Sequence, residues 1–227
     1  MSARAHDVLS TAAWHTLTAD ETLAHLQMCD VWLTSAGLQS LDRHAVMQAA
    51  EQMAQQGLRV LAFAVATSGE SLTSIRNETP QSLSLVELQG MMDPPRAEVI
   101  PAIAACKRAG IRVVMATGDH AATAAAMAHR IGLSDSAPEV RIGPQLEALS
   151  AEAFATILRH VSVFSRVSPA QKLQIVNTLR EQGHVVAVTG DGVNDAPALK
   201  AAHSGASMGR SGTDVAREAS DMVLADR

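Results

Sequence analysis

The stretch VTGDGVNDAPALK, residues 188–200, places Asp191, Asn194 and Asp195 within five residues of one another. It follows the apolar run 185–188, which is typical of a strand buried on both faces. Glycines on either side of Asp191 permit a tight turn, and Asn194 or Asp195 then caps a helix. Two neighbouring carboxylates repel each other unless a cation lies between them, and Mg²⁺ prefers oxygen ligands. An ordinary capped strand-turn-helix stays open as the alternative, because Asp and Asn are common in turns.

Two other apolar runs also end in polar side chains. Residues 111–116 lead into Thr117-Gly118-Asp119, where a hydroxyl and backbone N–H groups could bind an anion at a helix N-terminus. Residues 161–164 lead into a turn that ends at Pro169, and Lys172 lies in the first turn of the next helix. A lysine there is unfavourable against the helix dipole, which indicates either a bound phosphate or simple solvation. A hydroxyl, a lysine and a pair of carboxylates are thus expected at the ends of strands in one sheet. Together they predict a phosphoryl-transfer site with Mg²⁺.

The composition narrows the class of protein. The chain has 227 residues, of which 47% are hydrophobic, so it can bury a core. The net charge of −5 and the 2% of aromatic residues argue against nucleic acid as a partner. The two cysteines are far apart, so neither a disulfide framework nor a zinc site is expected. With neither a signal peptide nor an apolar stretch of about 20 residues in the sequence, we expect a cytoplasmic chain.

The elements that must position these residues change in character near residue 80. Residues 18–56 are expected to be mostly helical, with a helix from Leu41-Asp42 that stops at Gly57, followed by a strand over 58–65. A linker is expected over 66–82. Beyond it, strands alternate with helices, which predicts an α/β fold with right-handed βαβ units and a parallel sheet. The expected strands are 84–90, 111–116, 161–164, 184–189, 204–208 and 221–224; the expected helices are 95–109, 120–131, 150–159, 169–182 and 194–202.

Six stretches give the chain a family resemblance, in the family's own order over roughly residues 45 to 227. They are GLRVLAFA (57–64), MMDPPRAEV (91–99), MATGDH (115–120), FSRVSPAQKLQIV (164–176), VTGDGVNDAPALK (188–200) and ASDMVLAD (219–226). Together they resemble the cytoplasmic part of P-type cation-transporting ATPases, members of the haloacid-dehalogenase-like superfamily. The DPPR and FSRVSP stretches are most similar to the calcium, sodium/potassium and proton pump branches.

The resemblance implies a role for each motif residue. Asp191 and Asp195 are similar to the residues of the Mg²⁺ site, and Asn194 is similar to the residue that shapes the site around the phosphoryl group. Thr117 and Gly118 are similar to the residues that hydrogen-bond a phosphoryl oxygen, and Lys172 to the lysine that neutralises its charge. Thr117, Lys172 and Asp191 are thus the expected catalytic residues. The resemblance further implies that Arg59, Asp119 and Arg166 bind or orient ATP.

The resemblance also implies a fold and a division into domains. Residues 1–82 would be part of an α+β nucleotide-binding domain. Residues 83–227 would be the phosphorylation domain, a Rossmann-like parallel sheet with helices on both faces. Neither DKTGT, which carries the nucleophilic aspartate, nor KGAPE of the adenine pocket occurs in the sequence. The expected sheet therefore lacks its nucleophile strand.

The function that the resemblance implies is that of a pump fragment. It would supply the Mg²⁺ and phosphate-stabilising part of an ATPase at the cytoplasmic face of a membrane, and would be inactive alone. Its partners would be the nucleophile strand, the adenine-pocket part, and the actuator and membrane domains. A stand-alone phosphatase is the second hypothesis, disfavoured by the absent nucleophile. A non-catalytic or regulatory protein that binds Mg²⁺ and phosphate is the third.

Overall fold

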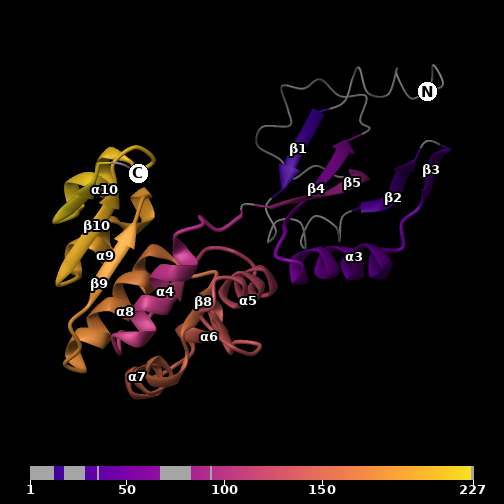
Figure 1. The fold of residues 1–227 in the computed structure, drawn as a ribbon. Coiled ribbons are helices and arrows are strands. Elements are labelled where there is room, and N and C mark those ends of the chain that lie inside the picture. The colour runs from indigo at the N-terminus through magenta and orange to yellow at the C-terminus, as the bar shows by residue number, and fades with distance from the viewer. Residues whose placement is uncertain (1–12, 18–28, 35, 67–82, 93, 226–227) are drawn as a thin grey trace. The chain divides into compact units, whose positions relative to one another are not determined.

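The computed structural model describes residues 13–17, 29–34, 36–66, 83–92 and 94–225. The chain divides into two compact units, residues 1–94 and residues 95–227 (Figure 1). Unit 1 has one sheet and unit 2 has two, and each unit buries hydrophobic residues of its own, so each is described by itself.

Unit 1 is built on a five-stranded sheet with the order β1-β4-β5-β2-β3. Neighbouring strands are antiparallel except for β2 and β5, which are parallel. Helix α3 packs on this sheet, and its Val46 joins Ala62 of β4 and Leu85 of β5 in the core. The elements are β1 (Ala13–Leu17), β2 (Cys29–Thr34), β3 (Gly37–Ser40), α3 (Arg43–Gln55), β4 (Arg59–Ala66) and β5 (Leu83–Met91).

Helix α3 confirms the expected helix in this part of the chain. The Asp42 carboxylate accepts a hydrogen bond from the Ala45 N–H at 3.0 Å, which caps the first turn. Gly57 has φ +82°, a conformation that ends a helix readily only in glycine. The expected linker over 66–82 lies almost wholly outside the described residues.

Two expectations for unit 1 are wrong. Cys29–Thr34 and Gly37–Ser40, expected to be helical, pair instead as the antiparallel strands β2 and β3, and Gly37 adopts φ +108°, a conformation that favours glycine. Strand β5, expected in the parallel sheet, pairs antiparallel with β4 from Arg59↔Met91 to Ala66↔Leu83. This long pairing holds β5 in unit 1, so the boundary between the units falls after Pro94 rather than after residue 82.

Unit 2 contains two separate three-stranded sheets, β11-β10-β9 and β6-β8-β7, in which all neighbouring strands are parallel. Strands and helices alternate along the chain, so the α/β fold with parallel sheets is confirmed. The elements are α4 (Val99–Arg108), β6 (Met115–Ala116), α5 (Ala121–Arg130), β7 (Val140–Ile142), α6 (Gly143–Glu147), α7 (Ala151–His160), β8 (Val163–Ser165), α8 (Pro169–Glu181), β9 (Ala187–Gly190), the 3₁₀ turn η1 (Val193–Asp195), α9 (Ala196–Ala201), β10 (Ser204–Met208), α10 (Asp214–Ala219) and β11 (Met222–Leu224).

Helices cover both faces of the β6-β8-β7 sheet. Val163 and Phe164 are consecutive residues of β8, so their side chains point to opposite faces. Phe164 packs against residues of α7 and α8, among them Phe154 and Ile175. Val163 packs instead against small residues of α5, including Ala128. The fully buried strand β8 therefore forms the centre of this layer.

The strands expected on either side of the nucleophile strand are shorter than the sequence indicates. Of residues 111–116 only Met115–Ala116 pair as a strand, and β9 begins at Ala187 rather than at residue 184. In the described residues, β6 pairs only with β8, and β9 pairs only with β10. The chain ahead of each is exposed, Val185 by 87% and Ile111 by 57%. Within the described residues both strands are therefore edge strands, whose second side has no partner strand.

Candidate functional site

Three of the expected site residues of unit 2 each follow a strand of one of the two parallel sheets. Thr117 comes directly after β6, Arg166 after β8 and Asp191 after β9. The carboxyl ends of the strands in open α/β sheets are where ligands bind. The structure thus places one expected site residue at the same end of each of these strands.

Lys172 is positioned by the first turn of α8. Ser168 caps this helix: its hydroxyl accepts from the Gln171 N–H at 3.3 Å, and the Gln171 side-chain oxygen accepts from the Ser168 N–H at 2.9 Å. Pro169 follows at the first helical position, where its missing N–H leaves no hydrogen bond unmade. This reciprocal capping fixes the start of α8 and with it the backbone of Lys172.

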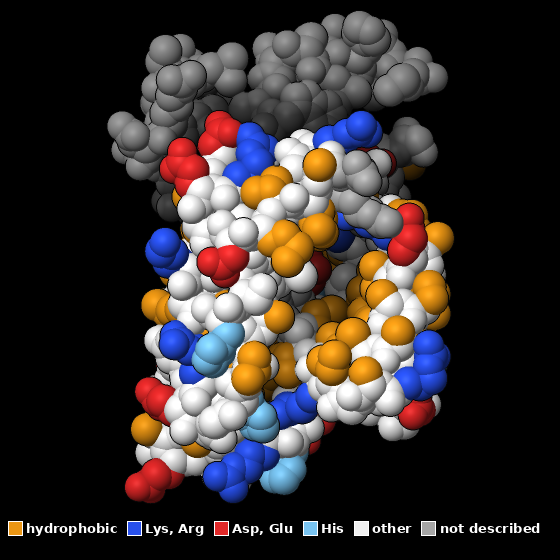
Figure 2. Space-filling model, turned by 60° about the vertical axis from the view of Figure 1, so that its left-hand side comes forward, with side chains coloured by type: hydrophobic (Ala, Val, Ile, Leu, Met, Phe, Trp, Pro, Cys, Tyr) orange, Lys and Arg blue, Asp and Glu red, His pale blue; other side chains and the backbone are white. Residues whose placement is uncertain are grey.

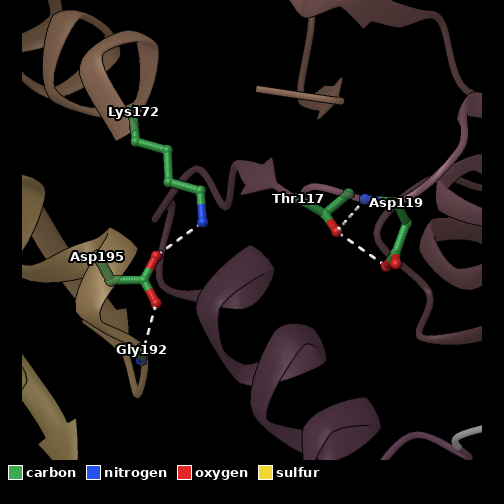
Figure 3. A network of polar contacts seen from close by, with 5 residues as sticks. All are labelled: Thr117, Asp119, Lys172, Gly192 and Asp195. Atoms are coloured by element: carbon green, nitrogen blue, oxygen red, sulfur yellow. Dashed lines mark hydrogen bonds and ion pairs between the residues drawn. The ribbon is translucent and has the colours of Figure 1, made fainter. Parts of the chain in front are cut away.

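The Lys172 ammonium donates to Asp195 Oδ1 at 2.7 Å, and each side chain is only 18% exposed (Figure 3). The second oxygen, Asp195 Oδ2, accepts from the Gly192 N–H at 3.2 Å. Gly190 allows this close approach, because a Cβ there would lie 2.5 Å from the Asp195 Cβ. This charge-assisted contact is the less exposed of the two lysine–carboxylate ion pairs among the described residues. The sequence did not indicate this ion pair.

Thr117 and Asp119 form a second polar group, which no dashed line joins to the first in Figure 3. The Thr117 hydroxyl donates to Asp119 Oδ2 at 2.8 Å and accepts from the Asp119 N–H at 3.1 Å. Gly118 lies between them in the same exposed turn. The Thr117 hydroxyl is therefore already bonded to the carboxylate of its own turn.

The turn after β8 is held in an uncommon conformation. Arg166 has φ +51°, the left-handed region that non-glycine residues seldom adopt. Its N–H donates to the Asp119 carbonyl at 3.3 Å, so the turns after β6 and β8 are tied together. Gly143 lies close against the same turn: a Cβ at this position would be 2.2 Å from the Arg166 carbonyl oxygen. The Gly143 carbonyl also accepts from Gln171 Nε2 at 2.7 Å.

The structure ties the remaining expected site residues less clearly to the Lys172–Asp195 and Thr117–Asp119 groups. Asn194 lies exposed in η1, beside Asp195. Arg59 begins β4 in unit 1, so the structure does not place it with the others. Of the two residues proposed as the helix cap, Asp195 occupies the position before α9, but its side chain makes no capping hydrogen bond.

The carboxylates available for a metal are Asp191 and Asp195. Among the described residues, no cluster of three or more His, Cys, Asp or Glu side chains could hold a metal ion. Mg²⁺ usually keeps several waters and uses only one or two carboxylates together with phosphate oxygens. The two carboxylates are oxygen donors of the kind that Mg²⁺ uses; Asp191 is exposed, and Asp195 is engaged by Lys172.

Unit 2 thus has parallel strands covered by helices, with a threonine, a lysine and carboxylates near the carboxyl ends of the strands, which is where open α/β sheets bind their ligands. The haloacid dehalogenase-like hydrolase family model matches residues 12–203. The chain therefore belongs to the haloacid dehalogenase-like hydrolase family.

Three curated relatives, each of them an ATPase, illustrate the similarity. Over 207 residues the chain is 50% identical to the probable cation-transporting ATPase F of Mycobacterium tuberculosis, covering 88% of this chain and 23% of that protein. It is 49% identical to the cation-transporting ATPase pma1 of Synechocystis sp., covering 88% and 22%. It is 44% identical to calcium-transporting ATPase 1 of Saccharomyces cerevisiae, covering 83% and 20%. The chain thus spans less than a quarter of the length of these relatives.

The resemblance to cation-transporting ATPases is accordingly confirmed over most of the chain. No helix within the described residues is both long enough and apolar enough to cross a membrane.

Proposed function

We propose that this chain is the Mg²⁺- and phosphate-stabilising part of a P-type cation-transporting ATPase. The observation that carries the proposal is the division of unit 2 into two parallel sheets whose outer strands, β6 and β9, each end in a site residue. A strand from another segment, lying between them and ending in an aspartate, would bring that carboxylate between Thr117 and Asp191. The names of the relatives supply the expectation of cation transport.

The proposed chemistry is transfer of a phosphoryl group from ATP to that aspartate, followed by hydrolysis. Lys172 would neutralise charge on the phosphoryl group, and the Thr117 hydroxyl with the Gly118 N–H would hydrogen-bond its oxygens. Asp191 and Asp195 would hold Mg²⁺, which supplies positive charge to the transferring group. For this to happen, Lys172 must leave Asp195 and Thr117 must leave Asp119, since both are engaged in the isolated chain.

The remaining roles are assigned to ATP and to the rest of the pump. Asp119 and Arg166 would orient the nucleotide, Asn194 would shape the phosphoryl site, and Arg59 would reach the nucleotide phosphates from a partial nucleotide-binding domain. The actuator and membrane domains and the adenine pocket would come from the remaining pump. The chain would then lie at the cytoplasmic face of a membrane.

The proposal can be tested by phosphorylation with the chain as one component and a peptide that supplies the missing strand as the other. We expect that the chain alone, incubated with radiolabelled ATP and precipitated with acid, retains no label, because Lys172, Thr117 and Asp191 cannot accept a phosphoryl group covalently. Adding a peptide that carries an apolar strand followed by DKTGT, with radiolabelled acetyl phosphate as donor, should place hydroxylamine-sensitive label on the peptide. Acetyl phosphate needs no adenine pocket.

The controls separate assembly from chemistry. A peptide with asparagine in place of the nucleophilic aspartate should bind without being labelled. Lys172→Gln and Asp191→Asn should lower labelling by at least about a hundredfold, the usual cost of removing a group that stabilises a transition state. Hydroxylamine-sensitive label on the chain without peptide would contradict the proposal. Peptide binding without any labelling would favour the non-catalytic protein that binds Mg²⁺ and phosphate.

A further inference from the structure

The loop that follows β10, residues 209–213, lies beside the turn that carries Asp191. Strands β9 and β10 pair in parallel as far as Gly190↔Ser207, so their carboxyl ends are neighbours. Beyond that pairing, the Thr213 N–H donates to the Asp191 carbonyl at 2.8 Å. Asp191 itself is exposed, so this backbone hydrogen bond helps to determine where its carboxylate lies.

Arg217 of α10 holds this loop from one side. Its Nη1 donates to two loop carbonyls, that of Gly209 at 3.0 Å and that of Gly212 at 2.5 Å. Its Nη2 is ion-paired with the Asp214 carboxylate, which orients the guanidinium group. Hydrogen bonds from a charged donor are roughly twice as strong as those from a neutral one. A single side chain therefore ties together the beginning and the end of the loop.

The backbone leaves the loop little room to relax. Gly212 is buried, and its N–H donates to the Met208 carbonyl at 3.0 Å. A Cβ at Gly212 would lie 2.0 Å from that same oxygen. At the other end of the loop, the Gly209 N–H donates to the Leu224 carbonyl of β11 at 3.0 Å. A displacement of either glycine carbonyl would therefore be passed along the loop to the Thr213 N–H.

We propose that Arg217 is a positioning residue for Asp191: it holds residues 209–213 so that the Thr213 N–H fixes the Asp191 backbone. This inference deepens the function proposed above and rests on it, because it takes Asp191 as a ligand of Mg²⁺. Arg217 would act through the loop and not on the metal, since its positive charge by itself opposes a divalent cation. Loss of the arginine should therefore weaken Mg²⁺ binding although it removes a positive charge.

Titration of the ¹⁵N-labelled chain with Mg²⁺ at constant ionic strength tests the proposal, with the Asp191 amide as the NMR reporter. We expect Arg217→Gln to bind Mg²⁺ about tenfold more weakly, the lower end of the usual cost of losing a residue that orients a metal ligand. Arg217→Lys should recover most of the affinity, because in the arginine one nitrogen serves both carbonyls. Unchanged affinity in Arg217→Gln would overturn the proposal.

Arg210→Gln is the matched control, because Arg210 is exposed in the same loop and carries the same charge. It should bind Mg²⁺ as tightly as the unchanged chain or slightly more tightly. Basic and acidic side chains are interspersed over most of the face in Figure 2, so the loss of one charge should have only a local effect. Equal weakening by Arg210→Gln and Arg217→Gln would overturn the positioning role.

Hydrogen exchange in the absence of metal separates this inference from the function on which it rests. Arg217→Gln should speed exchange of the Thr213 amide at least about tenfold, because an amide exchanges faster when its hydrogen bond opens. The Met115 amide, which donates to the Ser162 carbonyl in the other sheet of unit 2, should exchange as before. Equal acceleration at both amides would show general destabilisation and would count against the proposal.

Gly212→Ala provides a second route to the same loop without a change in charge, and it replaces Arg217→Gln if that variant does not fold. It should weaken Mg²⁺ binding and expose the Thr213 amide in the same way. If Asp191→Asn leaves Mg²⁺ binding unchanged, the assignment of the metal site fails. If instead Thr213 exchange is unaltered in Arg217→Gln, Arg217 does not hold the loop and the inference drawn from it is wrong.

Discussion

Lys172 and Asp195 neutralise each other beside the turn that follows β9, and this pairing governs what the isolated chain can bind. The ammonium lies 2.7 Å from the Asp195 oxygen that a metal ion would need. Two unit charges about 4 Å apart interact by about 4 kcal/mol at the effective dielectric constant near a protein surface. On the proposed assignment, the same lysine that would assist phosphoryl transfer would oppose Mg²⁺ while no phosphate is present.

We predict that the chain binds Mg²⁺ with a dissociation constant in the millimolar range, about 4 kcal/mol of binding free energy. Lys172→Met should tighten this binding several-fold, because it removes the competing cation. Asp191→Asn should weaken it below detection. Isothermal titration calorimetry measures both effects.

Lys200→Met is the control for the change in net charge, because Lys200 is exposed and lies one turn beyond Asp195. Equal tightening by the two lysine variants would show a general charge effect, and weaker binding by Lys172→Met would contradict the competition.

At the scale of the element, α8 carries Lys172 to the site, and its capping residues determine where the helix starts. Ser168→Ala removes one side of the reciprocal cap with Gln171. We expect a loss of about 1 kcal/mol in the free energy of unfolding. Urea denaturation followed by circular dichroism measures it. Ser211→Ala, in the exposed turn after β10, should change the free energy by less than about 0.5 kcal/mol; equal losses from the two variants would argue against the cap.

Periodicity and turn residues predicted most of the elements of unit 2 but few of their lengths. Strand β10 has the expected bounds, because its small residues alternate between buried and half-buried positions, a pattern that is typical of a strand. Strand β7 was missed, since three residues are too few for any period to appear. The β2–β3 hairpin was taken for helix because the local pattern carries no information about the partner strand β5. Pairing between distant segments is what one sequence shows least.

The candidate site likewise combines features that the sequence indicates with features that only the structure shows. The sequence alone proposes Asp191, Thr117 and Lys172, because each lies shortly after an apolar run that ends at a turn or at the start of a helix. The ion pair of Lys172 with Asp195 joins residues 23 positions apart on different elements. The approach of Gly143 to Arg166 and Gln171 likewise depends on three segments at once. Neither could be derived from spacing along the chain.

At the scale of the whole molecule, the outer strands β6 and β9 leave backbone groups available to a further strand. The exposed apolar residues ahead of them, Ile111 and Val185, would also be covered by it. Open edges of this kind recruit other chains. The chain should therefore gain stability from a segment that fits between the two sheets.

We predict that the chain alone melts below about 65 °C, the top of the range usual for mesophilic domains. A peptide carrying the missing strand should raise the melting temperature by at least about 5 °C, since 1 kcal/mol shifts it by roughly 2–4 °C at this size. Circular dichroism melts and light scattering measure stability and association together. A scrambled peptide is the control. A monomer that melts cooperatively above 65 °C and ignores the peptide would show that unit 2 is self-sufficient.

Gly143 connects the exit of β7, the turn after β8 and the start of α8, because the absence of one methyl group lets all three meet. Any side chain there must push the Arg166 carbonyl away, and the displacement would reach Gln171 and its neighbour Lys172. In genetic terms this is a position where a conservative-looking change gives a heat-sensitive phenotype. Gly143→Ala belongs among the variants that a screen for temperature-sensitive function would return, although no residue of the candidate site would have been altered.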